Sequence, residues 1–315
     1  MIAIAEIERA RETIAGAAIR TPLVRLDVDG PAEIWLKLEN LQPIGSFKIR
    51  GAANAVRSAP AAETARGVVT VSAGNMAQGV AWAARELGVP ATIVAPDQAP
   101  QTKLDAIARL GGHVVKVPYE RWWEIMTTSR YEEADGLFVH PVQDERVMAG
   151  NGTIGLELAE DLPDADGVLV PWGGGGLFTG IASALAALRP EQKLYAVQPD
   201  TANAVGAAVE AGEPREAAFT PSFVDGAGAK VVLPAMWQRA RPLLAGAYAV
   251  SLDETAAAVR LLAERARVVA EGAGALAVAA ALSGRVPGRK LVCIVSGGNI
   301  DAERLVAILR GETPA

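Results

Sequence analysis

Short apolar runs rich in β-branched residues alternate with alanine-rich amphipathic stretches along most of this chain, and this alternation limits the possible folds more than any other feature. The runs predict strands at residues 67–72, 90–95, 113–117, 167–171, 193–197 and 290–295. The intervening stretches predict helices at residues 47–57, 77–87, 101–110, 177–188 and 253–269. Strands that alternate with helices form mostly parallel sheets with helices on both faces. The sequence therefore predicts an α/β fold.

The number of these strand–helix units exceeds what one open sheet usually holds, and 315 residues suffice for two domains. We expect two lobes, each a mostly parallel twisted sheet flanked by helices. The active site is expected in the cleft between them, at the carboxyl ends of strands. Residues 1–51 and 145–315 are assigned to a large cofactor-binding lobe, and residues 52–144 to a small mobile lobe that carries the substrate-binding loop.

Charge and cysteine content exclude several classes of protein. The formal net charge is −6 with both signs scattered, so no basic block indicates nucleic-acid binding. The one cysteine, Cys293, lies in an apolar run, which predicts a buried strand residue and fits a reducing, cytoplasmic location. Neither a signal peptide nor a membrane span of about 18 apolar residues is present. The two histidines have no partners at metal-ligand spacing, so no metal is expected.

Lys48 is the first candidate for chemistry. It follows Gly45-Ser46-Phe47, which interrupts an extended stretch, and falls in the first turn of the predicted helix. The positive end of a helix dipole disfavours a cation, which lowers the pKa of a lysine. Schiff-base chemistry needs such a deprotonated amine. An ordinary surface lysine is the alternative.

Four consecutive glycines, Gly173 to Gly176, follow a predicted strand and open a helix. Their backbone N–H groups and the helix N-terminus suit a phosphate. The loop completes neither the nucleotide P-loop nor the Gly-x-Gly-x-x-Gly pattern. Residues 272–277 do match Gly-x-Gly-x-x-Ala, but a predicted helix precedes them instead of a strand, so we interpret them as a closely packed helix end.

Two further loops follow predicted strands. The segment 72–79, Ser-Ala-Gly-Asn-Met-Ala-Gln-Gly, lies at a strand-to-helix turn whose free N–H groups suit a carboxylate, although a simple capped helix start is the alternative. The segment 296–299, Ser-Gly-Gly-Asn, places a hydroxyl and two glycines just after a buried strand, where a ligand can approach closely.

In this order, the four segments resemble the fold-type-II pyridoxal-phosphate enzymes, and within them the serine/threonine dehydratase group, which includes serine racemase. The resemblance extends from Thr21 to Asn299. It implies a pyridoxal 5′-phosphate cofactor, with Lys48 and Ser72 as catalytic residues. The implied cofactor-binding residues are Phe47, Lys48, Asn75, Gly173, Gly174, Gly175, Gly176, Leu177 and Ser296. The implied substrate-binding residues are Ser72, Ala73, Gly74, Asn75 and Met76.

The chain departs from the group at four positions. Met76 replaces a histidine, which leaves the identity of the substrate side chain open. Ala73 replaces the serine that racemising members use as an acid, and an alanine has no proton to give. Gln198 and Ala204 replace acids of members with a divalent-cation site, and both are poor ligands for a hard cation. The roles of Glu271 and Asp225 stay unassigned. The appended regulatory domain of biosynthetic threonine dehydratases is not expected.

The resemblance implies a dehydratase, or ammonia-lyase, of amino-acid metabolism. This carbon–oxygen lyase would convert a 3-hydroxy amino acid, serine or threonine by default, to a 2-oxo acid and ammonia. Ser296 favours elimination, because a neutral hydroxyl leaves the cofactor ring a weaker electron sink than a carboxylate would. The alternatives are β-replacement, racemisation, dehydration of a bulkier 3-hydroxy amino acid, a non-catalytic binding protein and a nicotinamide dehydrogenase. We expect a cytoplasmic homodimer that binds a small amino acid and neither nucleic acid nor membrane.

Overall fold

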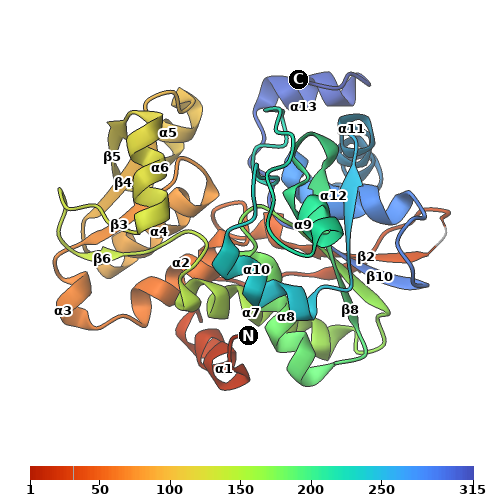
Figure 1. Cartoon of the computed structure of the whole chain (residues 1–315), viewed down its shortest axis with the longest axis horizontal. Helices are drawn as coiled ribbons and strands as arrows, with labels where there is room; N and C mark the ends of the chain where they lie inside the picture. Colours follow the sequence, from red (N-terminus) through yellow and green to blue (C-terminus); the bar gives the residue numbers. More distant parts are fainter. Residues whose placement is uncertain (31) are drawn as a thin grey trace.

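Two separate sheets organise the computed structural model, which describes residues 1–30 and 32–315 (Figure 1). The larger sheet has the order β1-β2-β10-β7-β8-β9, with β1 Leu23–Arg25, β2 Glu33–Leu38, β10 Lys290–Val295, β7 Gly167–Pro171, β8 Lys193–Pro199 and β9 Gly246–Val250. The smaller sheet has the order β5-β4-β3-β6, with β5 Gly112–Val117, β4 Ala91–Pro96, β3 Val68–Val71 and β6 Leu137–Phe138. The prediction of an α/β fold with two mostly parallel sheets is confirmed.

The strand register brings the carboxyl ends of the central strands to one edge of each sheet. Every described pairing is parallel except that of β1 with β2. In the larger sheet, Leu38 pairs with Val295 and Pro171 pairs with Val197, so the ends of β2, β10, β7 and β8 are adjacent. The loops that follow these ends carry the candidate residues, as the connectivity of parallel sheets requires.

Helices cover both faces of both sheets. In chain order they are α1 Ile4–Thr13, α2 Lys48–Arg57, α3 Ala61–Thr64, α4 Asn75–Leu87, α5 Gln101–Arg109, α6 Tyr119–Thr128, α7 Glu145–Asp161, α8 Gly176–Leu188, α9 Ala204–Ala211, α10 Pro234–Ala240, α11 Leu252–Leu261, α12 Gly272–Leu282 and α13 Ala302–Leu309. Short 3-10 turns lie at Glu39–Leu41, Asp200–Ala202 and Arg241–Leu243, and a π turn lies at Leu262–Ala266. Among the described residues, no helix is long and apolar enough to cross a membrane.

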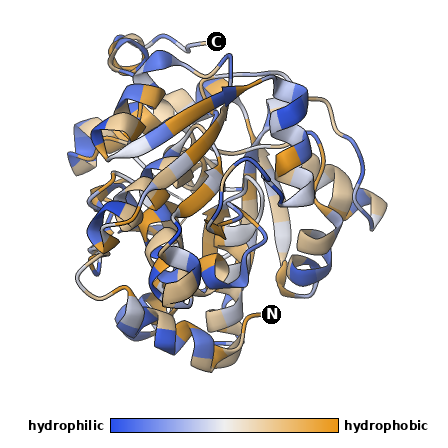
Figure 2. Cartoon of the chain, turned by 90° about the vertical axis from the view of Figure 1, so that its left-hand side faces the viewer, coloured by the Kyte–Doolittle hydropathy of each residue, from blue (hydrophilic) through white to orange (hydrophobic). Residues whose placement is uncertain are grey.

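The hydrophobic core is divided among the faces of the sheets. In the larger sheet, Leu169 and Cys293 pack with α11 and α12 on one face, while Val168 and Val292 pack with α7 and α8 on the other. In the smaller sheet, α4 and α5 pack on one face and α6 on the other. Figure 2 shows hydrophobic residues along the interior strands and hydrophilic ones on the outer helices.

Two details of the predicted elements are corrected. The helix expected over residues 253–269 ends earlier: α11 stops at Leu261, the π turn follows, and Arg267 adopts a left-handed backbone with φ 59°. The glycines at 272–277 begin α12 instead of ending a helix. Gly274 is needed there because a methyl group at this position would overlap the carbonyl oxygen of Gly297. Cys293 is buried in β10 as predicted, and burial raises the pKa of its thiol.

Candidate active site

Lys48 is the first residue of α2 and lies beside the Ser296 loop. The segment before Lys48 runs alongside residues 296–299: Phe47 N–H donates to Ser296 O at 3.0 Å, and Gly298 N–H donates to Gly45 O at 2.9 Å. Ser296 itself follows β10 and is only 4% exposed. The lysine segment and the segment 296–299 are 200 or more residues apart in the chain. These two hydrogen bonds join them side by side in the structure.

The amine of Lys48 lies among protein atoms. Burial lowers the pKa of Lys48 to about 8, and the carboxylate of Glu271 opposes this shift. A lowered pKa of Lys48 was expected from the helix dipole, whereas removal of the amine from water is the principal cause in the structure. The amine also lies 5.0 Å from the centroid of the Phe47 ring. A nucleophilic amine at near-neutral pH follows from this setting.

The glycine loop joins β7 to α8 as predicted, and its backbone leaves donors free. Among the described residues, no protein acceptor receives the N–H groups of Gly173, Gly174 or Gly175. Gly175 has φ +93°, and a methyl group there would come within 2.6 Å of the Trp172 ring. A methyl group on Gly174 would overlap the side chain of Val142. The loop is thus a cradle of free N–H groups at a helix N-terminus, which suits a phosphate.

These residues fit pyridoxal phosphate. The glycine cradle would hold its phosphate, and the Lys48 amine would hold its carbonyl carbon. Phe47 packs against the same hydrophobic core cluster as Trp172 and Leu177, the residues that flank the four glycines. The hydroxyl of Ser296 lies at the carboxyl end of β10, next to the lysine segment. The donors and the amine that the cofactor needs are therefore present on adjoining elements.

Residues 72–79 begin α4 on the side of the small sheet. Gly74 N–H donates to the Ser72 hydroxyl at 3.2 Å, and α4 starts at Asn75. The first N–H groups of a helix have no partner within it, so this turn can receive a carboxylate. Gly79 packs α4 against α2, since a methyl group there would lie 3.2 Å from Lys48 O. The turn at residues 72–75, which the sequence motifs predict to bind the substrate, and Lys48 therefore lie at the starts of two neighbouring helices.

Met76 has a different setting from the other residues of this loop. Its side chain is 2% exposed and packs in the core cluster on the α4 face of the smaller sheet, together with Ala52 and Val147. Ser72, Ala73, Gly74 and Asn75 are all half-buried. Any influence of Met76 on the substrate is thus expected to pass through the position of α4.

Arg50 anchors the helix that carries Lys48. Its guanidinium, buried in the protein, forms paired hydrogen bonds with both carboxylate oxygens of Glu39 and of Glu157. Lys37, also buried, adds a second cation next to Glu157. Two buried cations thus face two buried carboxylates, and the balanced charge makes their burial tolerable. The network ties α2 to β2 and α7.

Gln198 links backbone segments at the end of β8. Its side chain, 1% exposed, donates to Trp172 O at 3.1 Å and accepts from Val205 N–H at 2.7 Å. Both the nitrogen and the oxygen of the Gln198 amide are therefore hydrogen-bonded. The bond to Trp172 O fixes the residue that directly precedes the glycine loop. Ala204 is buried beside it at the start of α9. Among the described residues, no group of three His, Cys, Asp or Glu could hold a metal ion.

Three residues that sequence reasoning did not place in the site are found there. Glu271 accepts a hydrogen bond from Asn75, Asn299 donates one to Asn75, and Val142 contacts the glycine loop. Asn299 belongs to a recognised motif, which could have indicated it. Glu271 and Val142 lie far along the chain from the residues they contact, so only the fold brings them together.

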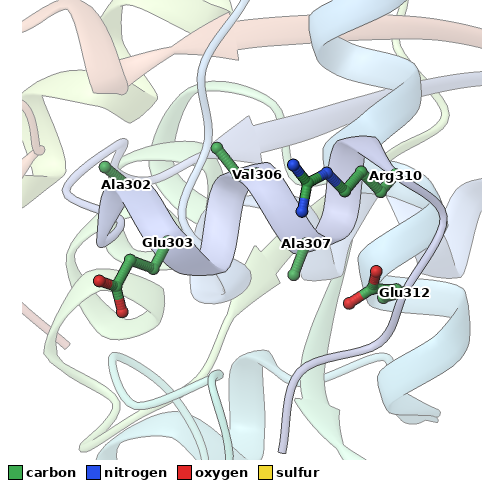
Figure 3. Close-up of a pocket in the computed structure, with 6 residues that line it drawn as sticks. All are labelled: Ala302, Glu303, Val306, Ala307, Arg310 and Glu312. Atoms are coloured by element: carbon green, nitrogen blue, oxygen red, sulfur yellow. The ribbon is translucent and has the colours of Figure 1, made fainter.

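A pocket of about 330 Å³ lies elsewhere, along α13 (Figure 3). Its lining residues are Ala302, Glu303, Val306, Ala307, Arg310 and Glu312. None of the candidate site residues contributes to it, so it has no part in the chemistry at Lys48.

Comparison with known proteins identifies a family. Residues 14–297 match the family described as pyridoxal-phosphate dependent enzyme. The chain is 41% identical to the L-threonine ammonia-lyase of Thermotoga maritima, covering 98% of this chain and 78% of the relative. It is 39% identical to the catabolic L-threonine dehydratase TdcB of Escherichia coli, covering 98% and 96%. The structure of maize serine racemase superposes with a TM-score of 0.89 at 31% identity, covering 98% and 97%.

The match includes Lys48, the turn at residues 72–75, the glycine loop and Ser296. It confirms the cofactor expected from the sequence motifs, and the geometry around Lys48 and the glycine loop accommodates that cofactor. This chain therefore belongs to the family of pyridoxal-phosphate-dependent enzymes.

Proposed function

We propose that this chain is an ammonia-lyase that converts L-threonine or L-serine to the corresponding 2-oxo acid and ammonia. The observation that carries the proposal is the half-buried Lys48, whose amine has a lowered pKa and lies beside a neutral Ser296 and close to the start of α4. The names of the relatives support the substrate class, since two threonine ammonia-lyases or dehydratases share 41% and 39% of their residues with this chain.

The bound cofactor supplies an electron-withdrawing ring that stabilises negative charge at the substrate Cα. Lys48 Nζ removes the Cα proton, and the β-hydroxyl leaves, so that one proton and one hydroxyl depart together as water and Lys48 returns to its neutral form. The turn at residues 72–75 binds the substrate carboxylate through its free N–H groups. Addition of water to the released product then yields the 2-oxo acid and ammonia. Water is lost and regained, so the overall reaction is the deamination of the hydroxy amino acid.

Racemisation is the second candidate, because maize serine racemase is a close structural match. It requires a proton donor on the face of the substrate opposite Lys48. Ala73, the residue aligned with the donor serine of racemising members, has none. Sequence identity is also higher to the threonine ammonia-lyases than to this racemase. Elimination is therefore the function that the observations support best.

Borohydride reduction followed by peptide mapping tests the assignment of Lys48. We expect the cofactor adduct on Lys48 and release of 2-oxo acid from L-threonine, with both lost in Lys48→Ala. Lys37 is an internal control, because it is buried in the Arg50 network and should carry no label. An adduct on Lys37 or Lys230, or 2-oxo acid formation by Lys48→Ala at the unmodified rate, would contradict the proposal.

The homodimer, the cytoplasmic location and the lobe boundaries belong to the same proposal. Leu41 and Val269 are 48% and 47% exposed, and Asn40 joins their segments by donating to Val269 O. This apolar surface supports self-association of the 32.7 kDa chain, which sedimentation equilibrium measures directly.

The boundary at 51/52 falls within α2, so motion of the small lobe would bend or rotate this helix.

A further inference from the structure

Glu271 is a buried carboxylate that the proposed reaction does not use. It directly precedes α12, and the residue is 8% exposed. Its N–H donates to Gly297 O at 3.0 Å, which fixes it next to the Ser296 loop. Gly297 is required at this point, because a methyl group there would overlap Glu271 Oε1. The absence of a side chain at Gly297 thus allows the carboxylate of Glu271 to lie next to the Ser296 loop.

The carboxylate of Glu271 and the amide of Asn299 together fix the orientation of the Asn75 amide. Asn75 Nδ2 donates to Glu271 Oε1 at 2.9 Å, and Asn299 Nδ2 donates to Asn75 Oδ1 at 2.8 Å. A flipped Asn75 amide would set oxygen against oxygen and N–H against N–H. An amide nitrogen carries two hydrogens, so Asn75 keeps one N–H for another acceptor.

These contacts cross between the lobes. Asn75 starts α4 on the small sheet, whereas Glu271 and Asn299 follow or precede elements of the large sheet. We propose that Glu271 is a positioning residue that holds Asn75 against the large lobe and directs its remaining N–H toward the cofactor. The direction of the Asn75 N–H toward the cofactor rests on the proposed function. The hydrogen bond that holds Asn75 does not depend on the cofactor.

The ionisation of Glu271 changes across neutral pH, and the strength of this hold changes with it. Burial, with a smaller contribution from Asp225, raises the pKa of Glu271 to about 7, while Lys103, Asn75 and Lys48 oppose the shift. Lys103 Nζ also donates a hydrogen bond to Asp225 at 2.7 Å and so links α5 to the segment that carries Asp225. A charged acceptor binds an N–H more strongly than a neutral one, so the hold is strongest when Glu271 is ionised.

The test compares Glu271→Gln with Glu271→Met. Glutamine keeps an acceptor oxygen at the same place, whereas methionine has a similar size and no strong acceptor. In cofactor-free protein, we expect the backbone amides of residues 75–79 to exchange hydrogen about tenfold faster in Glu271→Met than in the unmodified chain. Glu271→Gln should stay within about threefold. In the loaded protein, Glu271→Met should bind pyridoxal phosphate roughly tenfold more weakly and shift its absorption band.

Equal exchange rates and equal cofactor affinities in Glu271→Met and the unmodified chain would overturn the proposal. If Glu271→Met does not fold, Asn299→Leu removes the other partner of Asn75 and should produce the same faster exchange, with unchanged exchange counting against the hold. Failure of the proposed function has a separate signature. It would appear as an unlabelled Lys48 or as no 2-oxo acid in the unmodified chain, and the exchange measurement on cofactor-free protein does not depend on either.

Discussion

At the residue scale, the protonation of Lys48 is set by burial and by one carboxylate. Burial lowers the pKa of the amine to about 8, and Glu271 opposes that shift. Glu271→Gln removes the negative charge but keeps the hydrogen-bond acceptor, so the pKa of Lys48 should fall further. The rate at which trinitrobenzenesulfonate modifies Lys48 in cofactor-free protein, followed by peptide mapping against pH, measures this. The midpoint should move to lower pH in the variant. A midpoint that stays in place would show that Glu271 does not affect the amine.

Gly174 gives a second test at this scale, through the space available to the phosphate. In Gly174→Ala the added methyl group would overlap Val142, and the loop or Val142 must move. Overpacking of this kind costs about 1–3 kcal/mol, so cofactor affinity should fall roughly tenfold or more. Gly30→Ala is the matched control, because a methyl group there meets nothing closer than 3.9 Å. Equal affinities in the two variants, both folded, would count against the phosphate cradle.

Single residues differ in how far the sequence reveals them. Lys48 and the glycines of the loop could be proposed as site residues from the sequence, because each lies in a short segment whose neighbouring residues indicate its chemistry. Glu271 was noticed as an acid without a role, since its partner Asn75 lies 196 residues away. The cause of the lowered pKa of Lys48 was equally out of reach, because burial of a side chain depends on the whole fold.

At the scale of elements, α2 depends on the buried network around Arg50. Arg50→Met would leave the carboxylates of Glu39 and Glu157 with fewer partners inside the protein. Breaking a buried ion pair in this way costs about 3–5 kcal/mol, so the free energy of unfolding should fall by that amount in urea titrations at pH 7. Arg66→Met is the control, because Arg66 is exposed and its replacement should change stability by about 0.5 kcal/mol at most.

The same network predicts the acid limit of stability. Burial alone would raise the pKa of Glu39, but Arg50, Thr21 and Lys37 outweigh it and keep the pKa below the ordinary value of 4.5. A carboxylate with a lowered pKa stabilises the folded state above its unfolded pKa, and this contribution is lost as the pH falls through the folded pKa. Stability of the unmodified chain should therefore decline below about pH 4.5. A stability that is flat from pH 5 to pH 3 would contradict this account of the network.

Among the elements themselves, every strand and helix that the sequence pattern predicted is present, but β1, β2, β6 and β9 were not predicted, and one helix end was wrong. The stretch 253–269 has helical periodicity throughout, yet α11 gives way to a π turn and then to Arg267 in a left-handed conformation. The break allows α12 to start afresh and to pack Gly274 against the Ser296 loop. The contact joins residues far apart in the chain, whereas periodicity reflects only neighbouring residues. The break in the helix could therefore not be predicted from the periodicity.

At the scale of the whole molecule, the two sheets were predictable and their assembly was not. Counting strand–helix units indicated two lobes, but the order of strands and the contacts between Lys103 and Asp225 arise only in the fold. Activity is expected not to need a divalent cation, because Gln198 already joins Trp172 to Val205 through hydrogen bonds. Dialysis against a chelator should leave kcat within about twofold. A large loss that Mg²⁺ or Ca²⁺ restores would reveal a cation site in the protein.

The central claim is that the chain eliminates instead of racemising, and one assay tests it most directly. The loaded enzyme is given L-serine, and 2-oxo acid and D-serine are measured together over time. We predict that 2-oxo acid forms roughly 100-fold faster or more, because Ala73 offers no proton donor opposite Lys48 and an unpositioned water forgoes most of the gain from general-acid catalysis. Ala73→Ser should narrow this ratio if its hydroxyl reaches the substrate. D-serine that appears as fast as 2-oxo acid in the unmodified enzyme would contradict the account.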